Sequence, residues 1–251
     1  MRRCRVALVT ILLAAVCLAG CQSPVPAPTG LPSPGFTPCA YCAEARVVSV
    51  VDGDTIRVDL DGAVRSVRYI GIDTPESAQP GYKTATDVNR RLVTGQTVWL
   101  EKDTSDTDVH GRLLRYVWLA DGRMVNEEIV RAGVAQAARY WPDVRYQPRL
   151  EAAATEAWRA KAGFWQGGAD AFSYGAVTAD SVRIRRCPNG NDVNGKAAFG
   201  KIVAVYGRNQ AGDWVQVRGP DRTGGWVEAS ALEITIAVSK IPFQDPGVDC
   251  R

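Results

Sequence analysis

The sequence lacks long hydrophobic runs, and no apolar stretch reaches the roughly 18 to 20 residues that a membrane-spanning helix needs. This absence excludes a polytopic membrane protein. Histidine is also scarce, with one residue, His110, and the charge is nearly balanced, with 30 Lys and Arg against 27 Asp and Glu. The 251 residues, 46% hydrophobic and 23% charged, are typical of folded protein and fit one large or two small domains.

The first twenty residues have the pattern of a secretory signal. Three arginines within the first five residues precede the short apolar segment 6–20. This segment ends in Leu-Ala-Gly-Cys at Cys21, which resembles the lipobox of bacterial lipoproteins and implies that Cys21 carries lipid after cleavage. An ordinary cleaved signal with an incidental cysteine is the alternative. We therefore expect a signal peptide at 1–20 and a secreted, extracytoplasmic protein that is lipid-anchored to the cell membrane.

A proline-rich tether follows the anchor and extends through residues 21–43. Six prolines lie within residues 22–38, together with Ser, Thr and Gly, so the segment has few core-forming residues. Removal of the signal leaves 27 basic residues against 27 acidic ones. The mature protein is therefore expected to be neutral overall.

Four cysteines remain after the signal and the anchor: Cys39, Cys42, Cys187 and Cys250. They allow three disulfide connectivities, and we favour Cys39–Cys42 with Cys187–Cys250 because each pair flanks or lies within one expected domain. A Cys-x-x-Cys pair could also bind zinc or exchange thiols. Zinc is disfavoured because no second such pair exists and only one histidine is present. Thiol exchange is disfavoured because the pair ends a tether and does not lie in a βα unit.

Two folded regions are expected after the tether. In residues 44–166, alternating apolar and polar residues, turn dipeptides such as Asp61-Gly62 and a helix-ending Gly95 predict five strands and three helices. The expected strands are 46–51, 55–60, 63–72, 97–102 and 112–119, and the expected helices are 82–94, 126–132 and 147–162. A linker at 167–178 and an all-β domain with a C-terminal tail at 179–251 follow.

Acidic and basic residues gather in short motifs of the first region. The motifs are Asp52-Gly53-Asp54-Thr55, Arg68, Asp73-Thr74-Pro75-Glu76 and His110-Gly111-Arg112. Carboxylates at strand ends suit a hard divalent cation, and the planar guanidinium of arginine suits phosphate oxygens. Each motif alone is a common turn or helix-start sequence. Together they indicate metal-assisted phosphoryl chemistry.

In this order and spacing the motifs resemble the staphylococcal nuclease (thermonuclease) family. Arg68 follows Asp54 by fourteen residues and precedes Asp73 by five. Residues 121–127 also resemble the family's sequence. The resemblance covers about residues 45–165. It implies a mainly β fold with α, a five-stranded OB-fold barrel with three helices suited to oligonucleotides, and one Ca²⁺ that assists phosphodiester hydrolysis.

The resemblance also implies roles for individual residues. Asp54 and Asp73 would bind the metal through carboxylates and Thr74 through its backbone carbonyl, so Ca²⁺ affinity would be weak and would improve with substrate. Glu76 would be the general base. Two arginines, Arg68 and Arg112, would stabilise the charge on the phosphate. The product would carry a 3′-phosphate.

Other residues near these motifs are given structural or substrate-binding roles. Asp52 is expected to accept backbone hydrogen bonds in its turn, with metal support as the alternative. His110 is expected to be a turn residue. The family shows tyrosines at positions 139 and 141, where this chain has Arg139 and Trp141, so we assign substrate binding to Tyr140 and Trp141 and base stacking to Trp141.

Two features weaken the expected attraction for phosphate. Residues 44–166 hold 17 basic and 18 acidic residues, and the loop 103–108 is acidic.

The C-terminal region resembles a bacterial SH3-like domain, a small all-β barrel. The resemblance is carried by Gly225-Trp226-Val227 and the turn that ends at Leu232. Such domains often bind cell-wall peptides, which implies a role in attachment. The aromatic residues Tyr206, Trp214 and Trp226 are expected in the core rather than on a ligand platform.

We therefore expect a monomeric, Ca²⁺-dependent nuclease, a phosphodiester hydrolase (endonuclease) that cleaves extracellular DNA, RNA or both at the cell envelope. Its partners would be the nucleic acid substrate, the membrane through the lipid, and cell-wall peptide. The rival hypothesis is a non-catalytic envelope lipoprotein that binds nucleic acid or another polyanion through its OB-fold. The complete acidic and basic set favours catalysis.

Overall fold

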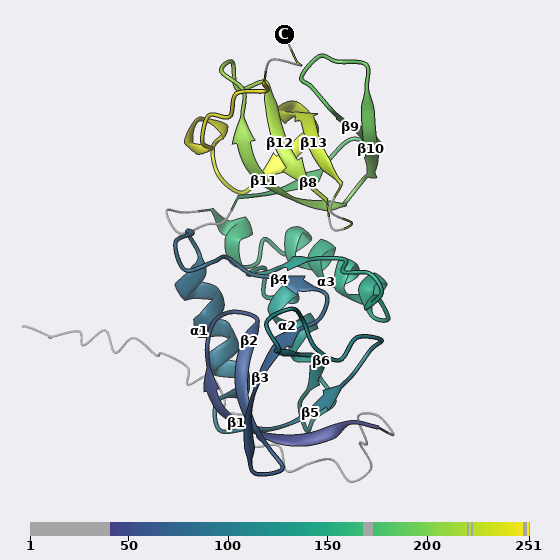
Figure 1. The fold of residues 1–251 in the computed structure, drawn as a ribbon. Helices are drawn as coiled ribbons and strands as arrows, with labels where there is room; N and C mark the ends of the chain where they lie inside the picture. The colour runs from purple at the N-terminus through teal and green to yellow at the C-terminus, as the bar shows by residue number, and fades with distance from the viewer. Residues whose placement is uncertain (1–40, 168–172, 220, 222, 248–249, 251) are drawn as a thin grey trace, which may run out of the picture. The chain divides into compact units, whose positions relative to one another are not determined.

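Five strands of the first domain close into a barrel in the computed structural model, which describes residues 41–167, 173–219, 221, 223–247 and 250. Apolar residues alternate along the strands, so that Ile56 and Val58 of the second strand are fully buried inside. Around the barrel the strands are β1 (Ala43–Val50), β2 (Thr55–Leu60), β3 (Ala63–Tyr69), β6 (Leu113–Trp118) and β5 (Thr97–Glu101) (Figure 1). The five-stranded barrel is confirmed.

Three helices accompany the barrel, also as expected: α1 (Tyr82–Val93), α2 (Val125–Arg131) and α3 (Gln147–Arg159). Two further strands, β4 (Ile72–Asp73) and β7 (Gln136–Ala137), form a separate antiparallel pair in which Asp73 lies opposite Gln136. Sequence periodicity could not find them, because two residues are too short to establish a period. This small pair fixes the backbone at Asp73.

The C-terminal region is an antiparallel sheet of seven strands. Their order in the sheet is β10 (Val193–Ala198), β9 (Ser181–Arg185), β13 (Gly224–Glu228), β12 (Trp214–Arg218), β11 (Ile202–Arg208), β8 (Tyr174–Val177) and β14 (Leu232–Ile234). Its described residues hold no α-helix, only the short 3-10 turns Ala229–Ala231 and Val238–Lys240. Trp214 and Trp226 are buried, as expected of core residues, whereas Tyr206 is 38% exposed.

The linker expected at 167–178 is shorter than the sequence suggested. Strand β8 lies inside that range and is buried along its whole length. Its Tyr174 ring stacks on Trp165 of the preceding 3-10 turn, Gly163–Gln166, with 6.3 Å between ring centroids. The sequence pattern missed this strand because all four of its residues are buried, so that polar and apolar positions do not alternate.

The described residues from 41 onward belong to one compact unit, and several contacts join the C-terminal region to α3 and the residues just after it. The Trp158 indole nitrogen donates a hydrogen bond to Glu233 (3.0 Å), and the Thr155 hydroxyl donates to the Gly200 carbonyl (3.2 Å). Ion pairs also join Lys161 to Glu233 and Lys201 to Glu151. The sheet is therefore fastened to the first domain at several points.

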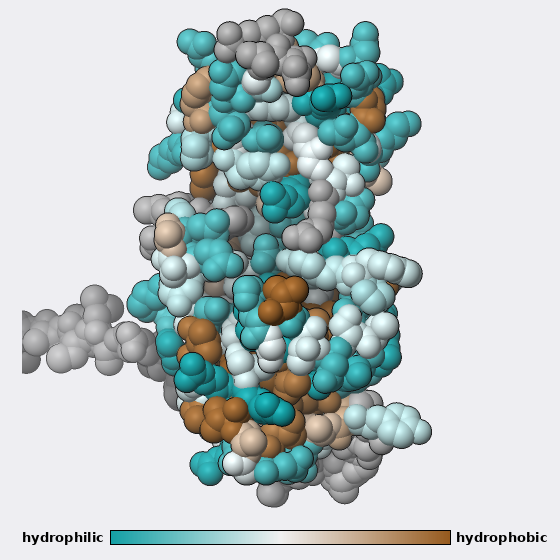
Figure 2. Space-filling model, viewed as in Figure 1, coloured by the Kyte–Doolittle hydropathy of each residue, from teal (hydrophilic) through white to brown (hydrophobic). Residues whose placement is uncertain are grey.

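Some of the N-terminal expectations lie outside the described residues. They are the signal peptide, the anchor Cys21, the tether up to residue 40, and Cys39 with its pairing to Cys42. Cys187 and Cys250 form a disulfide. In the part of the chain that the structure describes, we find no helix with the length and apolar character needed to cross a bilayer. On the face seen in Figure 2, hydrophilic side chains predominate and hydrophobic ones gather over the barrel.

Candidate active site

The Asp-Gly-Asp-Thr segment forms the tight turn into β2. The Asp52 carboxylate accepts a hydrogen bond from the Asp54 backbone (3.1 Å), as expected for a turn residue. A Cβ at Gly53 would lie 2.7 Å from the Thr74 hydroxyl oxygen and 2.8 Å from the Ala85 Cβ. Only glycine allows this approach of the turn to the Thr74 segment and to α1.

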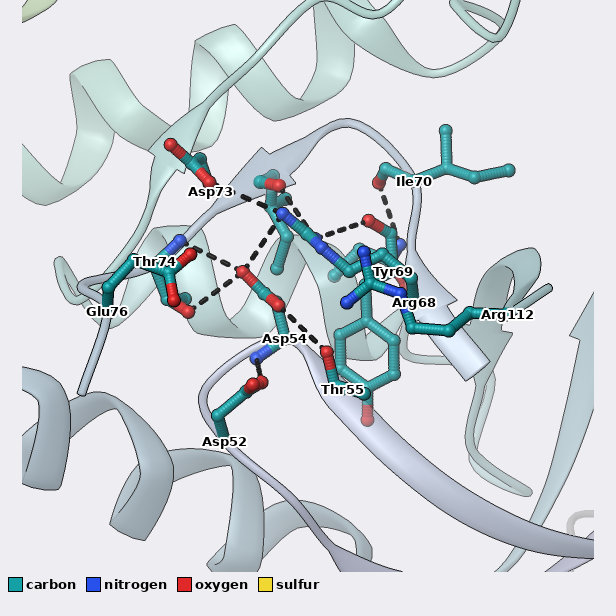
Figure 3. A network of polar contacts seen from close by, with 12 residues as sticks. Asp52, Asp54, Thr55, Arg68, Tyr69, Ile70, Asp73, Thr74, Glu76 and Arg112 are labelled. Atoms are coloured by element: carbon teal, nitrogen blue, oxygen red, sulfur yellow. Dashed lines mark hydrogen bonds and ion pairs between the residues drawn. The ribbon is translucent and has the colours of Figure 1, made fainter. Parts of the chain in front are cut away.

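Asp54 is the centre of a buried polar network (Figure 3). One carboxylate oxygen accepts hydrogen bonds from the Thr74 backbone (3.0 Å) and the Thr74 hydroxyl (2.8 Å). The other accepts from the Thr55 hydroxyl (3.1 Å). Burial raises the pKa of Asp54 to about 6, although the positive charge of Arg68 opposes this rise. A strongly perturbed carboxylate of this kind marks a candidate functional site.

Arg68 bridges two carboxylates. Its Nη2 lies 3.2 Å from Asp54 and 3.3 Å from Asp73, and its Nη1 donates to the carbonyls of Tyr69 (2.9 Å) and Ile72 (3.0 Å). Burial alone would lower the pKa of Arg68, but Asp54 and Asp73 outweigh burial and raise it. The guanidinium is therefore held as a fixed cation beside the two acids, with its side chain 14% exposed.

Glu76 lies in an exposed turn next to this network. Its backbone nitrogen donates to the Gln79 side chain (2.8 Å), and its carbonyl accepts from the Gln79 backbone (2.7 Å). Among the described residues no hydrogen bond or ion pair occupies the Glu76 carboxylate. It lines a cavity of about 320 Å³ together with Asp73 and Thr74. An exposed carboxylate at a cavity wall can accept a proton from bound water.

Arg112 is positioned by Asp108 and not by the central network. Its Nε donates to the Asp108 carboxylate (2.7 Å), which also accepts from the backbones of Arg112 and His110 (2.9 Å each). His110 is an exposed turn residue. The sequence did not single out Asp108 because it reads as one more acid in a polar loop.

The carboxylates of the acidic loop 103–108 are ion-paired. Asp103 pairs with Arg145 (3.4 Å) and Asp106 with Arg115 (2.8 Å), in addition to the pair between Asp108 and Arg112. Each carboxylate of the loop is therefore paired with an arginine, two of them close in sequence and one distant, while the expectation that the loop weakens phosphate attraction stays a prediction.

Tyr140 and Trp141 lie in different surroundings in the structure. Tyr140 lines a cavity of about 240 Å³ with Arg68 and Arg112. Trp141 is 84% exposed and is not among the residues that line this cavity. An aromatic ring beside two arginines can contact a nucleoside while the arginines hold its phosphate.

Asn89 is a structural residue of the site that sequence analysis did not find. It is fully buried on α1, and its amide donates to the Asp52 carbonyl (2.8 Å) and accepts from the Tyr69 hydroxyl (2.9 Å). The only signal was a polar residue on the buried side of an amphipathic helix. It ties the helix to the turn that carries Asp54.

The substitution Gly53→Ala tests the close approach of this turn. We expect a loss of about 1–3 kcal/mol in the free energy of unfolding, because the added methyl overlaps Thr74 and Ala85. Urea unfolding followed by circular dichroism measures the change. A variant within about 0.5 kcal/mol of wild type, the usual scatter of surface changes, would contradict the packing described here.

Comparisons with known proteins identify the family of the chain. The family described as staphylococcal nuclease homologue matches residues 66–167. The thermonuclease of Staphylococcus hyicus is 42% identical over 126 residues, which cover 48% of this chain and 74% of that protein. The chain belongs to the staphylococcal nuclease family. The SPbeta prophage-derived endonuclease YokF of Bacillus subtilis is 39% identical over 123 residues, 46% of this chain and 41% of that protein. An uncharacterized endonuclease of Escherichia coli O157:H7 is 40% identical over 127 residues, 49% of this chain and 79% of that protein.

The donor set of this staphylococcal nuclease domain fits a hard divalent cation. Asp54 and Asp73 lie beside the same Arg68 nitrogen and offer carboxylate oxygens, while the Thr74 segment contacts Asp54 through its N–H and hydroxyl. Within the described residues no three His, Cys, Asp or Glu side chains gather as a metal-binding group. A cation held here would therefore have few protein ligands and would need further oxygens from water or phosphate.

Proposed function

We propose that the chain is a Ca²⁺-dependent endonuclease that hydrolyses phosphodiester bonds of DNA, RNA or both and leaves 3′-phosphate ends. The observation that carries the proposal is the convergence of Asp54, Arg68 and Asp73 between Glu76 on one side and Arg112 on the other (Figure 3). Relatives named thermonuclease and endonuclease support the same reaction class.

In the proposed reaction Glu76 acts as the general base. Its carboxylate takes a proton from a water molecule in the cavity that it lines with Asp73, and the water oxygen bonds to phosphorus. The bond from phosphorus to the 5′-oxygen breaks, that oxygen takes a proton from solvent water, and Glu76 releases its proton to solvent. The products are a 3′-phosphate and a 5′-hydroxyl.

Arg68 and Arg112 stabilise the charge that develops on the phosphate. Both line the cavity of about 240 Å³, and each is held by a carboxylate, Arg68 by Asp54 and Arg112 by Asp108. Fixed cations need no reorganisation as the charge grows. When bound, Ca²⁺ at Asp54, Asp73 and the Thr74 carbonyl would polarise the phosphate as a Lewis acid.

We also propose that the enzyme acts outside the cytoplasm, held to the membrane by lipid on Cys21, and that the seven-stranded sheet is an SH3-like domain that binds cell-wall peptide. The N-terminal sequence pattern and the order of short β-strands from β8 to β14 support these two proposals. Incorporation of radiolabelled palmitate that is lost in Cys21→Ser tests the anchor.

Cleavage and binding measured in the same samples test the proposed activity. Labelled single-stranded and double-stranded DNA and RNA are incubated with the purified chain, with Ca²⁺ or with EGTA. We expect cleavage with Ca²⁺ that stops in EGTA and returns when Ca²⁺ is restored. Binding without cleavage under every metal tested would replace this proposal with the non-catalytic binding lipoprotein.

A further inference from the structure

The cavity that contains Glu76 is completed by the C-terminal sheet. The first domain contributes Asp73, Thr74, Glu76 and Gln79 to its wall. Strands β11 and β12 contribute Tyr206 and Arg218. The C-terminal sheet therefore reaches the residues to which the proposed function assigns water activation.

Contacts with the first domain hold Arg218 in this position. Gln136, which is buried, donates its side-chain amide to the Arg218 carbonyl (3.3 Å). Gln136 also pairs with Asp73 between β7 and β4. One residue thus links the backbone of Arg218 directly to the strand that carries Asp73.

The Arg218 guanidinium is oriented and available for a ligand. It lies over the Tyr206 ring, 5.5 Å from the centroid, and the Tyr206 hydroxyl donates to the Val217 carbonyl (3.1 Å), which fixes the ring. Arg218 is exposed, and among the residues the structure describes it has no ion pair. An unpaired arginine held at a cavity wall is suited to a phosphate.

Two cavities adjoin the acidic centre. Arg68, Arg112 and Tyr140 line one of them. Glu76 and Arg218 line the other. In Figure 3, Glu76 reaches the network from one side of Asp54 and Arg112 from the other. A nucleic acid strand with its scissile phosphate at Arg68 would therefore place a neighbouring nucleotide on the Arg218 side.

We propose that Arg218, oriented by Tyr206, binds the phosphate of the nucleotide that lies on the Glu76 side of the scissile bond. The C-terminal sheet would then be part of the substrate site and would favour substrates with more than one phosphate. This inference rests on the proposed nuclease function, which identifies the ligand as nucleic acid.

Substrate length distinguishes this role from a structural one. A dinucleoside monophosphate has only the scissile phosphate, whereas a tetranucleotide has two more. In the full chain, we expect Arg218→Ala to lower kcat/KM for the tetranucleotide about 10-fold and to affect the dinucleoside monophosphate much less, as loss of one charge-assisted hydrogen bond predicts. Arg218→Lys should recover part of the loss. The control Arg183→Ala removes an exposed arginine of β9 that lines a different cavity.

Equal losses on both substrates, or no loss on either, would overturn the proposal. A binding measurement tests the same proposal without catalysis. In EGTA, fluorescence anisotropy of a labelled tetranucleotide should give a dissociation constant about 10-fold weaker for Arg218→Ala, with a salt dependence shallower by about 0.7 in log–log slope. Unchanged binding overturns the proposal. If the chain never cleaves nucleic acid but Arg218→Ala still weakens tetranucleotide binding, the phosphate site at Arg218 would stand. The nuclease function would then be rejected.

Discussion

Glu76→Gln is expected to lower the rate of DNA cleavage by about 10²- to 10⁴-fold, the range that general-base catalysis contributes. The amide has nearly the size of the carboxylate but cannot take the proton from water. Because Glu76 is exposed and its described contacts are made by its backbone, the substitution should leave the fold intact. Single-turnover cleavage of a labelled oligonucleotide, with thermal melting of the same preparations, measures both properties.

Glu44→Gln is the matched control for this experiment. Glu44 is an exposed glutamate on β1, outside the residues that line either cavity. The Glu44→Gln variant should cleave DNA at the wild-type rate. If Glu76→Gln retains full activity, Glu76 is not the base, and the proposed mechanism fails even if the protein is a nuclease.

Arg68→Lys is expected to lower the rate of cleavage by about 10²- to 10³-fold, comparable to the loss of one fixed donor to a developing anion. Lysine keeps the positive charge but lacks the planar group that bonds both acids and the carbonyls of Tyr69 and Ile72. Cleavage under single-turnover conditions at saturating Ca²⁺ measures the loss.

Arg115→Lys controls for the general cost of replacing a buried arginine. Arg115 makes a similar set of bonds, to the Asp106 carboxylate and to the carbonyls of Asp106 and Leu114, and its side chain is 11% exposed. We expect a similar loss of stability in both variants but a large loss of activity in Arg68→Lys alone. Equal activity losses would assign Arg68 to the fold rather than to phosphate.

The centre of the site could be predicted from the sequence because its residues lie within one short stretch of chain. Asp54 immediately precedes β2, Arg68 is the penultimate residue of β3, and Asp73 follows a few residues later, so one hairpin and its continuation bring all three together. The barrel strands could also be predicted from the sequence, because the alternation of buried and exposed residues gives a hydrophobic pattern with a period of two.

Features that depend on contacts between distant residues could not be predicted in this way. The pairing of Asp103 could not be read from the sequence because its partner Arg145 lies some forty residues further along the chain. The role of Asn89 depends on where α1 meets the Asp52 turn. Likewise, nothing in the sequence near Arg218 indicates that its backbone bonds to Gln136, 82 residues earlier.

Hydrolysis of single-stranded DNA in H₂¹⁸O with Ca²⁺, followed by mass spectrometry of the fragments, tests the central claim most directly. If Glu76 activates water at the phosphate held by Arg68, each cleaved bond should yield a 3′-phosphate that carries one ¹⁸O, and the fragments should be absent in EGTA. Bound DNA that stays intact with Ca²⁺, or fragments whose terminal phosphates contain no ¹⁸O, would contradict the account.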